Sequence, residues 1–140
     1  MAADWTRKRI SEHIWYKEVL CPCGCIDKDN PFLYVDPGVI ALFEIWRTFV
    51  GHPLPITSFY RCEKHNKAIG GAVNSFHRLG AAIDFIDSQS ELTASYLSRL
   101  STVVGAGGLG IYLDEGHFHI DCGHLYGFTP TRRWRGREGG

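Results

Sequence analysis

The sequence lacks an excess of charge of either sign, and it contains no long hydrophobic run. Fifteen Lys and Arg residues balance fifteen Asp and Glu residues, so the formal net charge is zero. Because phosphate binding needs a basic surplus, we expect no nucleic-acid partner. The apolar runs are only a few residues long, so we expect no membrane-spanning helix. The first ten residues carry charges without an apolar stretch behind them, which is not the pattern of a secretory signal, and we expect a protein that is cytoplasmic when made.

The composition is that of one globular domain. The chain has 140 residues, of which 44% are hydrophobic and 21% charged, so it is neither disordered nor a coiled coil. We expect a single domain over residues 1–140, with a Cys-rich N-terminal segment at about residues 1–30 and a flexible Arg/Gly tail at 135–140. We also expect a monomer.

The order of predicted elements indicates an α+β fold with a small antiparallel sheet flanked by helices. Asp36 and Gly51 delimit the clearest helix, in which apolar residues recur at helical spacing. A short edge strand is expected at 54–58, a short helix at 62–69, and strands at 81–86, 111–113 and 117–122. A capping box at Ser88 predicts a further helix to about residue 103, and the glycines at 105–110 predict a loop.

The strand at 117–121 carries an unusual polar face. Because side chains alternate across a strand, His117, His119 and Asp121 should share one face. Taken alone, this pattern also fits a solvated polar face.

A second polar group strengthens the case for a metal site. Asp84 lies in a strand between Ile83 and Phe85, where a carboxylate is costly to bury without a compensating partner. With His77 and His119 it forms a His/Asp/His set, and catalytic zinc sites commonly use three protein ligands and leave the fourth position to water. Spacing alone leaves open the alternative that the Asp84 carboxylate binds no metal and instead caps a turn or pairs with Arg78.

The sequence around these residues resembles the zinc D-alanyl-D-alanine carboxypeptidase family, which includes phage endolysins and D,D-dipeptidases, and whose fold the Hedgehog signalling domain shares. The resemblance covers roughly residues 30–134. Its motifs are Thr57-Ser58-Phe59-Tyr60-Arg61, then Asn66, Gly70-Gly71 and the run Asn74-Ser75-Phe76-His77-Arg78-Leu79-Gly80-Ala81-Ala82-Ile83-Asp84, followed by His117-x-His119. The family signature is S-x-H-x(6)-D with a later His, and this spacing matches it.

The resemblance implies one catalytic zinc ion held by His77, Asp84 and His119. It also implies that Arg61 stabilises the substrate carbonyl or pairs with a carboxylate, and that His117 stabilises an oxyanion or supports a ligand. Ser75 would bind substrate or orient the loop that carries His77, and we also count Tyr60 among the substrate-binding residues.

The general base is the part of the pattern that departs from the family. In many relatives a carboxylate three residues before the last histidine ligand accepts the proton of the water, and here that position is Gly116. We favour Glu115, then Asp114, with Asp121 as a third option that equally suits orienting a histidine. Tyr126 and Phe128 line the substrate cleft or form a plain loop.

The five cysteines leave a second question open. Cys21, Cys23 and Cys25 could form a four-sulfur structural zinc site with Cys62, although C-x-C-x-C lacks the usual ligand spacing. Reduced buried thiols or an occasional disulfide are the alternatives.

Two functions follow. The first is a zinc metallopeptidase that hydrolyses peptidoglycan stem peptides through a zinc-activated water, as a D-Ala-D-Ala carboxypeptidase or an L-Ala-D-Glu-type endopeptidase. It would be released to the cell wall by phage lysis, or act in the cytoplasm as a dipeptidase. The second is a non-catalytic, zinc-stabilised cell-wall-binding module or phage structural module. A polar cluster without metal is a third possibility.

Overall fold

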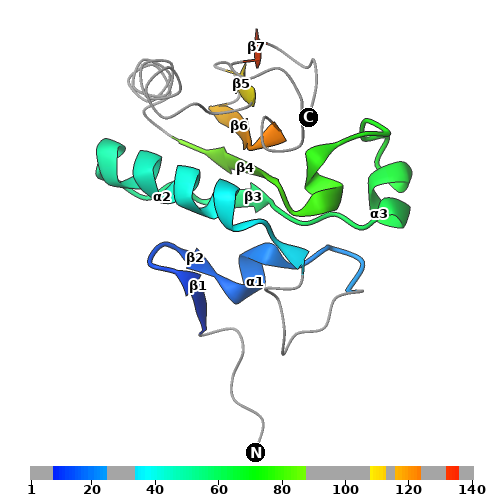
Figure 1. Ribbon diagram of the computed structural model, residues 1–140, viewed down its shortest axis with the longest axis horizontal. Coiled ribbons are helices and arrows are strands. Elements are labelled where there is room, and N and C mark those ends of the chain that lie inside the picture. Colours follow the sequence, from blue (N-terminus) through cyan, green and yellow to red (C-terminus); the bar gives the residue numbers. More distant parts are fainter. Residues whose placement is uncertain (1–7, 25–33, 88–107, 113–115, 124–131, 136–140) are drawn as a thin grey trace, which may run out of the picture.

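The computed structural model describes residues 8–24, 34–87, 108–112, 116–123 and 132–135, the last of these by backbone alone. In these ranges the chain forms a two-stranded and a five-stranded sheet with helices beside them (Figure 1). The α+β class expected from the sequence is confirmed. The expected helix at 88–103 lies outside the described residues, as do Asp114, Glu115, Tyr126 and Phe128. Among the described residues, no helix is long and apolar enough to cross a lipid bilayer.

The larger sheet has the strand order β3-β4-β6-β5-β7. Its strands are β3 (Ile56–Ser58), β4 (Ala82–Ile86), β5 (Gly108–Tyr112), β6 (His117–Asp121) and β7 (Arg132–Arg135). The first four pair antiparallel, and β7 pairs parallel to β5, so the sheet is not antiparallel throughout. β3 lies at an edge, as its flanking prolines predict.

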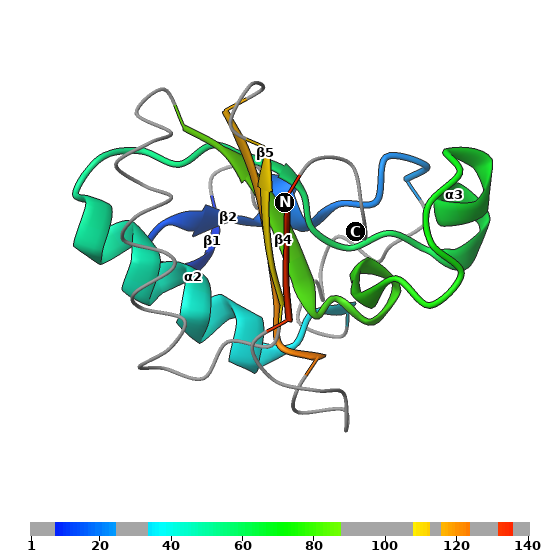
Figure 2. The same ribbon diagram turned by 90° about the horizontal axis from the view of Figure 1, so that it is seen from above.

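Helix α2 (Pro37–Val50) covers one face of this sheet, and α3 (Glu63–Ala68) lies on the opposite side (Figure 2). The Asp36 side chain accepts a hydrogen bond from the Gly38 amide at 2.7 Å, and Gly51 ends the helix with φ of 73°, as expected. Phe43 on α2 meets Phe85 on β4 edge to face, and Phe85 stacks on Phe118 of β6. The face under α2 is therefore the hydrophobic core.

The alternation of the strands gives the other face its polar character. Asp84 on β4 is directly paired with His119 on β6, and both point away from the aromatic core. The neighbouring strand β5 starts at Gly108, three residues earlier than the sequence predicts. Gly108 and Gly110 belong to the strand and not to the expected loop, whereas Gly105 and Gly107 lie outside the described residues. A Cβ on Gly108 would lie 2.3 Å from the Asp121 carboxylate. Glycine makes room for the polar side chains opposite it.

The N-terminal region adds a hairpin of β1 (Arg9–Ser11) and β2 (Ile14–Trp15) and the short helix α1 (Tyr16–Val19). Glu44 on α2 ties this hairpin to the domain by accepting hydrogen bonds from Ser11 and from the His13 backbone, and its carboxylate lies 2.6 Å from the His13 ring. His13 therefore has a specific acidic partner in Glu44.

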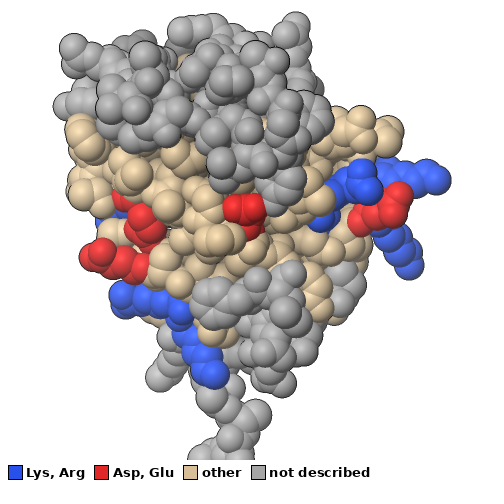
Figure 3. All heavy atoms as spheres, viewed as in Figure 1, with Lys and Arg blue, Asp and Glu red and all other residues tan. Residues whose placement is uncertain are grey.

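Charged side chains do not gather in one basic area on the visible face. In Figure 3 the described Lys and Arg side chains lie at two separate places, one over α3 and the other near β1, and acidic side chains lie beside each. This distribution agrees with the balanced composition.

Candidate metal centre

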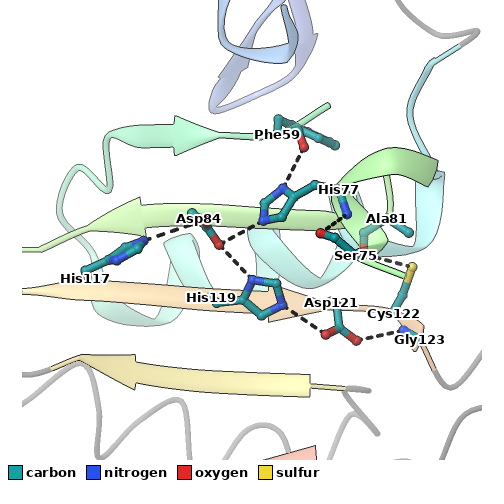
Figure 4. Close-up of polar contacts among 10 residues, drawn as sticks. All are labelled: Phe59, Ser75, His77, Ala81, Asp84, His117, His119, Asp121, Cys122 and Gly123. Carbon is teal, nitrogen blue, oxygen red and sulfur yellow. Dashed lines mark hydrogen bonds and ion pairs between the residues drawn. The ribbon is translucent and has the colours of Figure 1, made fainter. Parts of the chain in front are cut away.

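Three donor atoms from three different elements converge on the polar face of the sheet (Figure 4). His77 comes from the short 3-10 helix η3 (Phe76–Leu79), Asp84 from β4 and His119 from β6. Asp84 Oδ1 lies 3.1 Å from His77 Nε2 and 2.8 Å from His119 Nδ1. One ligand atom from each residue lies within 4.8 Å of the other two.

The local structure places His77 with little freedom. The Ser75 hydroxyl accepts a hydrogen bond from the His77 amide at 3.3 Å and caps η3. The ring Nδ1 of His77 donates to the Phe59 carbonyl at 2.7 Å, which fixes the tautomer and aims Nε2 at Asp84. This buried Nε2 lies 3.1 Å from Asp84 Oδ1 but makes no hydrogen bond of regular geometry among the described residues. A buried nitrogen with a free lone pair is what a metal ligand needs.

His119 is held from both sides by carboxylates. Its Nδ1 faces Asp84, and its Nε2 lies 3.0 Å from Asp121 Oδ2. The other oxygen of Asp121 accepts from the Gly123 amide at 2.9 Å, and the Asp121 side chain is completely buried. A carboxylate on the outer nitrogen of a histidine ligand is a recurring arrangement in zinc sites, where it orients the ring.

Electrostatics differ among the three residues. Burial lowers the pKa of His77, with Asp84 opposing, so the ring is neutral and able to ligate. Burial also acts to lower the pKa of His119, but its hydrogen bonds to Asp121 and Asp84 outweigh that effect and raise the pKa to about 9. Burial would raise the pKa of Asp84, but the surrounding histidines hold it well below its usual range. Asp84 is therefore a carboxylate at neutral pH.

The residues present fit a zinc ion. For Zn–N and Zn–O bonds of about 2.0–2.1 Å at the tetrahedral angle, donor atoms lie about 3.3 Å apart. The donor separations of 2.8 and 3.1 Å around Asp84 are close to this value. Two neutral-capable imidazoles and one carboxylate form a donor set that zinc accepts, and the contacts at Phe59 and Asp121 hold the two rings in a ligating orientation.

Of two further residues expected at the site, His117 lies beside Asp84, and Arg61 is buried within range of the Asp84 charge. His117 Nε2 is 3.8 Å from Asp84 Oδ2, and its ring, 28% exposed, stacks on Tyr112. Arg61 is 7% exposed, and burial lowers the pKa of its guanidinium against the opposing charges of Asp84 and Cys21. Arg61 also donates its amide to the His77 carbonyl at 3.0 Å, which links its position to that of the histidine.

Three other residues discussed in the sequence analysis, Tyr60, Asp121 and Arg78, do not contribute donor atoms to the His/Asp/His set. The Tyr60 ring packs against Tyr34 with centroids 5.2 Å apart. The contacts of Asp121 match its option of orienting a histidine. Arg78 lies 3.9 Å from Glu63, and the described contacts of Asp84 are with histidines and not with Arg78.

Sequence reasoning assigned no role to Asn66 or Asp87. Asn66 is buried on α3, its side-chain amide donates to the Ala72 carbonyl at 2.8 Å, and a Cβ on Gly71 would lie 2.1 Å from its oxygen. Asp87 is buried, and its carboxylate lies 2.7 Å from His52 Nε2. The motif of Asn66 with Gly70-Gly71 was the signal that could have indicated a structural role for Asn66. Nothing in the sequence indicated that Asp87 would be buried and paired.

Residues 12–121 match a model of the family described as Peptidase M15. The chain belongs to this peptidase family. The match begins earlier than the resemblance read from the motifs and also ends earlier; it includes β2 and the cysteine segment but not β1. It also spans all three convergent donors. No curated protein and no solved structure matches the chain.

Proposed function

We propose that this M15 family member is a zinc-dependent peptidase that hydrolyses peptidoglycan stem peptides, either by removing terminal D-alanine or by cutting within the stem. The observation that carries the proposal is the convergence of His77 Nε2, Asp84 Oδ1 and His119 Nδ1, with the buried His77 nitrogen making no hydrogen bond of regular geometry among the described residues. A role as a monomeric phage lysin, held in the cytoplasm until lysis, is part of the same proposal.

When bound by these three residues, zinc lowers the pKa of water toward neutrality and polarises a carbonyl group. Asp121 and the Phe59 carbonyl keep the two histidine rings in the ligating orientation. Arg61, whose charge is permanent, presents donors to a substrate carbonyl or terminal carboxylate. His117 lies at the more exposed side of Asp84 and donates a hydrogen bond to the oxygen that becomes negative as the peptide bond is attacked.

A carboxylate must still accept the proton of the attacking water and return it to the leaving amine. Glu115 and Asp114 are the candidates, in that order, because they immediately precede Gly116 and the His117 strand. The Gly116 carbonyl accepts from the Asp87 amide at 2.8 Å, which fixes the backbone at Gly116, the residue that follows these two in the sequence. Asp121 is the least suited, since both of its oxygens are occupied and the side chain is buried.

One observation favours the alternative of a non-catalytic cell-wall-binding or phage structural module. The position three residues before His119 is Gly116, whose φ is +59° and whose Cβ would lie 2.8 Å from the Asp87 carbonyl oxygen. An acidic side chain there would be strained and crowded, so the base used by many relatives is excluded at that position.

The deciding experiment measures metal content and hydrolysis of purified peptidoglycan on the same samples. We expect zinc at the His/Asp site of the wild type, lost together with activity in His119→Ala and in the isosteric Asp84→Asn. Glu115→Gln should abolish hydrolysis with zinc retained; if Asp114→Asn does so instead, Asp114 is the base. Zinc without hydrolysis would favour the binding module. No metal at this site would overturn the proposal and leave a polar cluster.

A further inference from the structure

A second cluster of metal-ligating side chains lies outside the His/Asp/His site. Cys21, Cys23 and Cys62 place their sulfur atoms in a triangle with sides of 3.2 Å (Cys21–Cys23), 3.3 Å (Cys23–Cys62) and 3.6 Å (Cys21–Cys62). Cys21 is buried, Cys62 half-buried and Cys23 exposed, so the triangle opens to solvent on one side. None of the four cysteines in the described part of the chain forms a disulfide.

Two segments that are 41 residues apart build this triangle. Cys21 follows α1 and begins a tight turn, in which the Gly24 amide donates to the Cys21 carbonyl at 2.9 Å and Gly24 adopts φ of 72°. This turn brings Cys23 back beside Cys21. Cys62 belongs to the second segment, where it is the N-cap residue of α3. The unusual C-x-C spacing is therefore no obstacle, because the third sulfur comes from elsewhere in the chain.

The separations suit a shared ion better than a covalent pair. A disulfide needs about 2.05 Å between sulfurs, and all three distances are far longer. Zn–S bonds of about 2.3 Å at the tetrahedral angle put sulfurs about 3.8 Å apart, slightly wider than this triangle. One disulfide would also use only two of the three sulfurs, whereas one ion uses all three.

Backbone amides point at two of the sulfurs. The Cys62 amide donates to Cys21 Sγ at 3.4 Å, and the His65 amide donates to Cys62 Sγ at 3.3 Å. Such hydrogen bonds stabilise the negative charge of a thiolate, which is the form that ligates metal. They are an observation independent of the sulfur triangle.

We propose that Cys21, Cys23 and Cys62 bind a structural Zn²⁺ ion as thiolates. Soft sulfur donors select zinc over the hard cations, and a solvent-facing side gives the ion an entry path. Cys25 lies outside the described residues and is not needed for these three contacts. The ion would link the segment after α1 to the residues at the start of α3, and it would thereby also restrain Arg61, the residue before Cys62.

The test counts zinc in full-length protein purified with reductant. We expect two ions per chain in the wild type, and one in Asp84→Asn, which disrupts only the His/Asp site. Cys21→Ser and Cys62→Ser should each lose one ion, while the matched control Cys122→Ser keeps both, because that thiol is buried elsewhere against the Ala81 carbonyl. If the His/Asp site binds no zinc, which would overturn the proposed function, the wild type should hold one ion and the two serine variants none. Equal zinc in the wild type and both serine variants would overturn the sulfur site.

Cobalt substitution supplies a readout that does not depend on activity or on a serine variant that folds. A thiolate-bound Co²⁺ gives a sulfur-to-metal charge-transfer absorption in the near ultraviolet. We expect this absorption in the cobalt-loaded wild type and, undiminished, in Asp84→Asn. Its absence from both would overturn the proposal.

Discussion

At the scale of the residue, the His/Asp/His site shows how a few contacts decide what a side chain can do. Asp84 and Asp121 are both carboxylates facing His119, yet they meet opposite nitrogens of its ring. Asp84 also faces His77 and therefore belongs to the convergent donor set. Asp121 is completely buried and bonded to the Gly123 amide, so it orients the ring.

The first prediction concerns Asp121. Asp121→Asn should weaken zinc binding at the His/Asp site by about 10- to 100-fold, because loss of an outer-shell carboxylate reduces ligand basicity and orientation. Competition with a chromophoric chelator measures this affinity. Asp87→Asn is the matched control, since Asp87 is also a buried carboxylate paired with a histidine but lies away from the donors. Equal affinities for the two variants would refute the role.

The second prediction is a pH dependence of the metal-free protein. The pKa of His119 is raised from 6.5 to about 9, so its protonated form contributes stability that is fully present below pH 6.5 and lost as pH rises through about 9. The pKa of Asp84 is lowered below 3.8, so its contribution is present above pH 3.8 and lost as pH falls further. With a chelator present, the free energy of unfolding should therefore be greatest between about pH 3.8 and pH 6.5, where both contributions are present.

Urea denaturation from pH 5 to about 9.5 tests the alkaline part of this curve. Zinc-loaded protein is the control, because an ion on His119 Nδ1 replaces the proton and should remove most of the decline. A free energy of unfolding that stays constant across this range in the chelated protein would contradict the assignment.

At the scale of the element, β5 illustrates a strand shaped by its neighbour. Its two faces differ in kind, since Leu109 and Ile111 are buried in the core while Gly108 and Gly110 pair with Asp121 and His119. Small residues on the polar face let the buried carboxylate of Asp121 pack against the backbone of β5. The loop prediction is wrong at Gly108 and Gly110, which lie in the strand; at Gly108 the glycine allows the Asp121 carboxylate to come close to the backbone.

The third prediction follows from this packing. Gly108→Ala should lower the free energy of unfolding by about 1–3 kcal/mol and weaken zinc binding, because the new methyl group would displace the Asp121 carboxylate. Ile111→Val, on the core face of the same strand, is the control: it should cost about 0.5–1.5 kcal/mol and leave zinc affinity unchanged. Denaturation and chelator competition on both variants separate the effects, and unchanged affinity in Gly108→Ala would argue against the mechanism.

At the scale of the whole molecule, the site is assembled from segments distant in the sequence. The five-stranded sheet supplies Asp84 and His119, η3 supplies His77, and the loop before α3 supplies Arg61. The N-terminal hairpin is attached to this body through Glu44, whose carboxylate serves Ser11 and His13 together. Burial would raise the pKa of Glu44, but these hydrogen bonds outweigh it and lower the pKa, so the contact is made by a carboxylate.

The fourth prediction tests this attachment. Glu44→Ala should lower stability by about 1–3 kcal/mol, because partly buried donors lose their acceptor. Hydrogen exchange should accelerate in residues 9–15 while β4 and β6 keep their protection. Glu63→Ala, an exposed glutamate at the start of α3, is the control and should change neither measurement noticeably. Uniform acceleration across the sheet would show that the hairpin is not a separately attached unit.

Much of this arrangement could be predicted from local sequence. The ends of α2 follow from Asp36 and Gly51, and the alternation of β6 places His117, His119 and Asp121 on one face, because capping and strand periodicity depend on neighbouring residues alone. The set His77, Asp84 and His119 was also found, through spacing and resemblance together. These features need no knowledge of distant contacts.

Tertiary structure decided the rest, because it depends on which segments meet. The sequence offered two roles for Asp121, and no local signal decides that it holds the outer nitrogen of His119; nor does any local signal show that β7 runs parallel to β5 or that Gly108 lies under a carboxylate. Likewise the sequence named Cys62 as one possible partner of the cysteine segment, but only the fold places its sulfur beside those of Cys21 and Cys23. Sequence determines which chemical groups are present and their local direction, whereas the packing of distant segments determines which of them share a site.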